Sequence, residues 1–63
     1  MFRIKVQSLD GKDLYYLDFL LGRPIAIKLE AKEQIKPMCE EYADDRIDAL
    51  IGPAGQRLVK EPA

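Results

Sequence analysis

The sequence predicts a small α+β domain in which a three-stranded antiparallel meander is covered on one face by a single helix. Three observations lead to this prediction. Residues 2–8, 13–19 and 23–30 alternate between apolar and polar side chains, and turn residues separate the three segments. From residue 35 the apolar spacing becomes that of a helix. At 63 residues the chain has room for one domain, residues 1–63.

The Asp10-Gly11 pair lies between the first two alternating segments. A two-residue Asp-Gly loop favours a type I′ turn, and such a turn fixes which residues of the two strands face each other. The predicted register separates an apolar face from a polar face. The facing pairs are Phe2–Phe19, Ile4–Leu17 and Val6–Tyr15 on the apolar face, and Arg3–Asp18 and Lys5–Tyr16 on the polar face.

The third alternating segment extends the same sheet. A three-residue loop, Leu21-Gly22-Arg23, would place Ile25 and Ile27 on the apolar face, followed by Leu29. The same register puts Lys28 beside Tyr16 on the polar face. The sequence therefore predicts a row of Lys5, Tyr16 and Lys28 across the outer side of the meander.

A helix is expected to cover the apolar face. Its sheet-facing side chains recur at helical spacing: Ile35, Met38, Cys39, Tyr42 and Ala43. Pro37 suits the first helical position, where the missing N–H costs no hydrogen bond. In this reading Cys39 is a small apolar side chain that faces the sheet.

Two endings of this helix are compatible with the sequence. In the first, the helix stops near Asp44, and residues 47–51 form a strand that turns through residues 52–55 into a last strand over 57–60. In the second, the helix runs to Ile51 and Gly52 caps it. The long helix would align Glu40, Asp44 and Asp48, whose like charges repel. We therefore favour the C-terminal β-hairpin and keep a βββα arrangement as the alternative.

The composition argues against catalysis. There is no histidine, and the single cysteine leaves neither an internal disulfide nor a cysteine–histidine pair. The segment Gly52-Pro53-Ala54-Gly55 lacks the spacing of a phosphate-binding loop and is predicted to be a turn. We expect no enzyme activity, no cofactor and no metal.

Two groups of charged residues are candidate interaction faces. The chain carries 10 basic and 11 acidic residues, so its net charge of −1 excludes a polybasic nucleic-acid binder. The polar face of the meander nevertheless combines cations with an aromatic ring, which suits nucleic-acid stacking. An acidic face on the helix could imitate a phosphate backbone. The sheet candidates are Arg3, Lys5, Tyr16 and Lys28, and the acidic candidates are Glu40, Glu41, Asp44, Asp45 and Asp48.

The favoured function is non-catalytic protein–protein interaction, as a small regulatory or accessory protein. Scarce reactive side chains, a small core and exposed strand edges support this hypothesis. A protein partner or a second copy of the chain is expected, since association would stabilise a domain this small. Nucleic-acid binding and phosphate mimicry are the alternatives. No apolar run approaches the roughly 20 residues that span a membrane, and a reduced thiol without an export signal predicts a cytoplasmic location.

Overall fold

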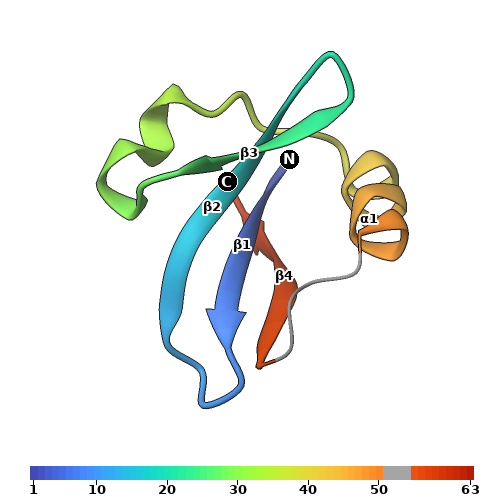
Figure 1. The fold of residues 1–63 in the computed structure, drawn as a ribbon. Coiled ribbons are helices and arrows are strands. Elements are labelled where there is room, and N and C mark those ends of the chain that lie inside the picture. The colour runs from blue at the N-terminus through green and yellow to red at the C-terminus, as the bar shows by residue number, and fades with distance from the viewer. Residues whose placement is uncertain (51–54) are drawn as a thin grey trace.

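The four strands form one antiparallel sheet of order β3-β2-β1-β4, with one main helix against it (Figure 1). The computed structural model describes residues 1–50 and 55–63. Its elements are β1 (Phe2–Ser8), β2 (Asp13–Leu20), β3 (Arg23–Ile27), the 3₁₀ helix η1 (Leu29–Gln34), α1 (Glu40–Ala49) and β4 (Gln56–Pro62). The predicted α+β fold, a β1–β2–β3 meander with one covering helix, is confirmed.

The central register of β1 and β2 is also confirmed, although its turn differs from the prediction. Ile4 faces Leu17, as expected, but Asp10-Gly11 is not a two-residue type I′ loop. The Gly11 N–H donates to the Ser8 carbonyl at 3.0 Å, and only Gly11 of this turn has a left-handed φ, at 92°. The longer loop would shift the register by one residue. A bulge at Leu14 restores it, because Gln7 pairs with Asp13 while Val6 pairs with Tyr15.

The type I′ geometry occurs instead at the β2–β3 turn. Leu20 pairs with Arg23, so the loop consists of Leu21 and Gly22, with left-handed φ values of 52° and 79°. This loop is one residue shorter than predicted. Because side chains alternate along a strand, the one-residue difference moves β3 side chains to the opposite face.

The predicted placement of the β3 residues is therefore wrong. Ile25 faces Asp18 and Ile27 faces Tyr16, so both isoleucines lie on the face expected to be polar. Lys28 does not join the row of Lys5 and Tyr16. The third strand also ends earlier than expected, at Ile27, and η1 begins at Leu29.

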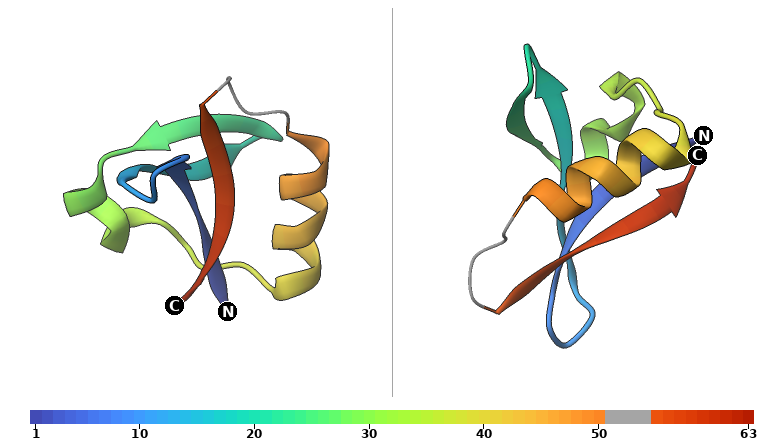
Figure 2. Two further views of the ribbon diagram at one scale, coloured as in Figure 1. Left: turned by 90° about the horizontal axis from the view of Figure 1, so that it is seen from below. Right: turned by 90° about the vertical axis from the view of Figure 1, so that its right-hand side faces the viewer.

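Both faces of the sheet carry a covering element. On one face, here the α1 face, α1 packs over a core whose buried members are Ile4, Val6, Leu17, Met38 and Ala43. On the other face, here the η1 face, η1 contacts β2. The left view of Figure 2 shows η1 and α1 on opposite sides of β1 and β4. Ile35 follows η1 directly and is only 2% exposed.

The helix begins later than predicted because Met38 is held in the sheet. Met38 and Phe2 exchange two backbone hydrogen bonds, at 2.7 and 2.8 Å, which keep the backbone extended at Met38. Pro37 is consequently not the first helical residue, and Cys39 is the N-cap of α1. The expectation that Cys39 faces the sheet is wrong, since this cysteine is exposed.

The C-terminal segment forms a strand, but not in the favoured hairpin. The strand predicted over residues 47–51 is wrong where the structure describes it, because α1 continues to Ala49. β4 pairs with β1 instead, with Lys60 facing Ile4. The alternative helix end at Ile51 is also wrong, because α1 ends at Ala49 and Leu50 has an extended backbone. The turn predicted over residues 52–54 lies outside the described residues. The edges of the sheet are β3 and β4.

Candidate interaction surfaces

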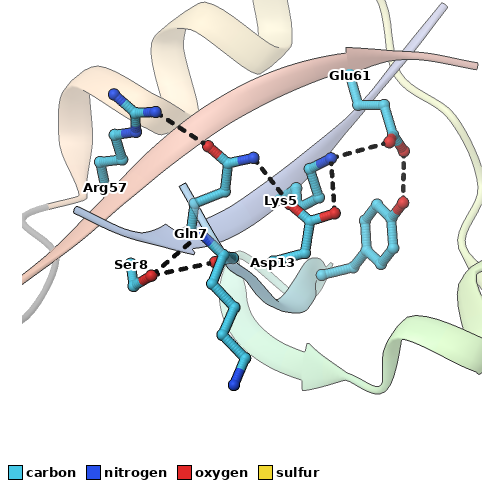
Figure 3. A network of polar contacts seen from close by, with 8 residues as sticks. Lys5, Gln7, Ser8, Asp13, Arg57 and Glu61 are labelled. Atoms are coloured by element: carbon cyan, nitrogen blue, oxygen red, sulfur yellow. Dashed lines mark hydrogen bonds and ion pairs between the residues drawn. The ribbon is translucent and has the colours of Figure 1, made fainter. Parts of the chain in front are cut away.

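The η1 face of β1, β2 and β4 carries a continuous polar network (Figure 3). Lys5 Nζ lies 3.3 Å from Asp13 Oδ2 and 3.1 Å from Glu61 Oε1. The Tyr16 hydroxyl donates to Glu61 Oε2 at 2.5 Å. Gln7 Nε2 donates to Asp13 Oδ1 at 2.7 Å and extends the network along β1. Each charged group of this network therefore faces a partner within the domain.

The pKa directions follow from these contacts. The hydrogen bond from Tyr16 lowers the pKa of Glu61 below its ordinary value, and Lys5 adds to this effect. Desolvation by burial raises the pKa of Tyr16, and the bond to Glu61 raises it further. For Lys5, desolvation lowers the pKa, but the bonds to Glu61 and Asp13 outweigh it and the net change is upward. The network thus favours its charged carboxylates.

The predicted sheet candidates do not form a common surface. Tyr16 is only 4% exposed, so its ring is not available to stack on a base. Lys5 is held between two carboxylates, and the Nε atom of Arg3 is buried. Lys28 lies apart from these residues. The arrangement gives the nucleic-acid alternative no support.

Lys28 instead lines an open depression of about 430 Å³ beside the end of β3. Its lining is mainly apolar, with Lys28 and Glu30 as the charged members. The remaining lining residues are Leu14, Tyr15, Ala26, Ile27 and Leu29. Small-molecule sites usually bring several polar groups together over an apolar floor, and this depression has only that one charged pair.

A lysine from β4 forms ion pairs with two of the five residues of the predicted acidic face. Lys60 Nζ lies 2.8 Å from Glu40 Oε2 and 2.9 Å from Asp44 Oδ1. The hydrogen bond to Glu40, followed by that to Asp44, raises the pKa of Lys60. Lys60 also lies over the Phe2 ring, 5.1 Å from its centroid. Two of the five acidic candidates therefore hold α1 against β4.

The other three acidic candidates lie on the outer side of α1. Glu41, Asp45 and Asp48 are exposed, and their i, i+4, i+7 spacing places them opposite the buried Ala43. The acidic face that the sequence offers for phosphate mimicry is therefore reduced to these three residues, because Glu40 and Asp44 pair with Lys60.

The tip of the β2–β3 hairpin presents apolar side chains to solvent. Leu21 is 95% exposed, Leu20 is 63% exposed and Ile25 is 38% exposed. We define the hairpin tip as Leu20, Leu21, Arg23 and Ile25. Sequence reasoning missed this surface, although the run Phe19-Leu20-Leu21 breaks the apolar–polar alternation and was a visible signal.

Phe19, the residue of β2 directly before the hairpin tip, packs against α1. The rings of Phe19 and Tyr42 meet edge to face, with centroids 6.5 Å apart and an interplanar angle of 86°. Arg46 Cζ lies 5.4 Å from the Phe19 centroid and 4.7 Å from the Tyr42 centroid. Such aromatic and cation–π contacts restrain both elements. These contacts hold the β2–β3 hairpin to α1 directly beside the hairpin tip.

The described residues provide no cluster of three or more side chains that could hold a metal ion. In the same part of the chain, no helix is long and apolar enough to cross a membrane. Comparison with protein-family models, with curated proteins and with solved structures found no match.

Proposed function

We propose that this domain is a non-catalytic protein-binding module that inserts its hairpin tip into an apolar pocket of a partner protein. The observation that carries the proposal is Leu21, which combines 95% exposure with a left-handed φ of 52°. Neither property favours the isolated domain. Both suit a residue that makes its contacts in a complex.

The left-handed conformation is costly for leucine. Steric contact between Cβ and the following carbonyl costs roughly 1–2 kcal/mol, and glycine or asparagine adopts the same conformation more easily. A type I′ loop prefers Asn-Gly, whereas this chain has Leu21-Gly22. Backbone strain of this kind is concentrated at functional sites. We infer that the leucine side chain is retained for binding.

The surroundings of the tip favour a protein over a membrane as the partner. Arg23 is exposed beside the leucines and would meet an acidic group at the rim of the pocket. The outward row of Glu41, Asp45 and Asp48 would be repelled by an anionic lipid surface. An exposed Cys39 is compatible with a reducing cytoplasm, which we propose as the location.

The test compares Leu21→Asn with Leu9→Asn. Leu9 is a matched control because it is also an exposed turn leucine, 67% exposed, and lies on the other hairpin. Asparagine removes the apolar side chain and tolerates the left-handed backbone. The tagged wild type and both variants are used to recover binding proteins from a lysate of the source organism, with quantification by mass spectrometry.

The proposal predicts a protein recovered by the wild type and by Leu9→Asn, and depleted about tenfold or more by Leu21→Asn. Equal recovery by all three proteins contradicts it. A parallel sedimentation with vesicles of phosphatidylcholine and phosphatidylserine tests the membrane. Binding there that depends on Leu21 would replace the protein partner by a lipid surface.

A further inference from the structure

β4 leaves one edge of the sheet open along seven residues, Gln56–Pro62. Two backbone hydrogen bonds show which facing residues of β1 and β4 are hydrogen-bonded pairs. They run from the Leu9 N–H to the Gly55 carbonyl and from the Ala63 N–H to the Met1 carbonyl. Hydrogen-bonded and non-hydrogen-bonded pairs alternate along an antiparallel ladder. The backbone N–H and C=O groups that point toward β1 are therefore those of Arg57, Val59 and Glu61. The alternate residues point outward: Gln56, Leu58, Lys60 and Pro62.

No described segment pairs with this outer edge, and Figure 2 (left) shows β4 nearest the viewer between α1 and η1. The other edge strand, β3, is less suited to pairing. It has only five residues. Its pairing with β2 leaves the backbone groups of Pro24 and Ala26 pointing away from the sheet. Pro24 lies inside this short strand and has no N–H to donate, which disfavours pairing along the edge, whereas Pro62 is the last residue of β4.

We propose that β4 pairs with β4 of a second copy of this chain, antiparallel and about a two-fold axis at Val59. This register places Leu58 opposite Lys60 of the second copy, so the outward backbone groups of both residues meet as hydrogen-bonded pairs. The two sheets become one continuous eight-stranded sheet. A two-fold interface uses the same strand from both copies.

The side chains of β4 are complementary in this register. On the η1 face, Val59 meets Val59 of the second copy, and Arg57 meets Glu61 of the second copy. The symmetry produces the Arg57–Glu61 pair twice. Arg57 is exposed, and among the described residues its guanidinium makes one hydrogen bond, to Gln7 Oε1 at 3.4 Å, so other donors of this group can reach Glu61 of the second copy. Glu61 is 27% exposed at the side chain and retains room for a third donor.

The size of the chain also favours a second copy. A domain of about 60 residues buries only about 60% of the surface exposed on unfolding, and association adds burial. The β4 edge lies on a different strand from the hairpin tip, so each proposal is tested without the other.

The first test uses a disulfide at the proposed two-fold axis to link the two copies covalently. It is done in a Cys39→Ser background. Residues that face each other in a non-hydrogen-bonded pair have Cα atoms about 4.5 Å apart, within the range of a disulfide. Val59→Cys should therefore form a covalent dimer under mild oxidation. Arg57→Cys is the matched control, because its two copies would lie about 14 Å apart along the strands.

The second test measures association by sedimentation velocity from 1 to about 200 µM, the range in which weak dimers are populated. The wild type should dimerise, and Arg57→Glu should raise the dissociation constant about tenfold or more, since it places two carboxylates together at both sites. Circular dichroism verifies that the variant is folded. A wild type that is monomeric throughout, or covalent dimers from Arg57→Cys but not from Val59→Cys, would overturn the proposal.

Discussion

Tyr16 on β2 and Glu61 on β4 are joined by a hydrogen bond of 2.5 Å, although β1 lies between their strands. Lys5 on the intervening strand bonds to the same carboxylate at 3.1 Å. The carboxylate of Glu61 thus links side chains from three strands. Because β4 joins the sheet only through β1, this contact holds the C-terminal strand to the meander.

Tyr16→Phe is expected to lower the free energy of unfolding by about 1–2 kcal/mol. The variant keeps the buried ring and removes one hydrogen bond to a charged acceptor. Urea denaturation measures the loss. Tyr15→Phe is the control and should change stability by less than about 0.5 kcal/mol. The Tyr15 hydroxyl makes no hydrogen bond within the described residues, so equal losses would contradict the role given to Glu61.

Acid should weaken the fold through Glu61. Its pKa lies below the ordinary value of 4.5 in the folded chain, chiefly because Tyr16 donates to the charged carboxylate. The resulting stabilisation is complete above pH 4.5 and is lost as the pH falls through the lowered folded pKa. Urea denaturation of the wild type and Glu61→Gln at decreasing pH measures this effect. The difference between them should be constant near neutral pH and shrink below pH 4.5.

The sequence predicted the β1–β2 register but not the turn that produces it. The alternation of apolar and polar residues constrains Ile4 to face Leu17, whatever loop joins the strands. The bulge at Leu14 absorbs the extra loop residue, and bulges leave little trace in a single sequence. For β3, the register depended on whether Leu21 accepts a left-handed conformation. Leucine rarely does, so the residue types alone do not indicate the two-residue loop.

The remaining differences arise from contacts between distant parts of the chain. The Met38–Phe2 bridge delays the start of α1, and the β1–β4 pairing brings Lys60 to Glu40. The spacing of apolar residues within one helix or strand does not indicate either of these contacts. The acidic residues of α1 are visible in the sequence, but the lysine that pairs with two of them could not be placed without the position of β4.

Lys60→Met should destabilise the domain, because it removes the cation shared by Glu40 and Asp44. Methionine keeps the apolar length of the side chain. The loss should be small and should decrease at high salt, since the lysine and both carboxylates are partly exposed. Lys36→Met, at an exposed lysine that forms no ion pair among the described residues, is the control. Denaturation in low and high salt distinguishes the two variants.

Cys39→Ser should stabilise the domain by about 0.5–1 kcal/mol. Cys39 is the N-cap of α1 with an extended backbone, φ −70° and ψ 159°, but its side chain makes no capping hydrogen bond. A serine hydroxyl accepts a bond from a free N–H of the first turn. Thermal or urea denaturation under reducing conditions measures the gain. Cys39→Ala adds no acceptor, and an equal gain from it would contradict the capping argument.

Leu21→Asn should raise the free energy of unfolding by about 0.5–1 kcal/mol, because asparagine adopts the left-handed φ of 52° with less strain. The exposed leucine loses few contacts on replacement. Leu9→Asn relieves no positive φ and should leave stability nearly unchanged. Urea denaturation compares the three proteins. If Leu21→Asn is more stable than the wild type and also recovers less of the binding protein, the strain at this position is retained for recognition and not for folding.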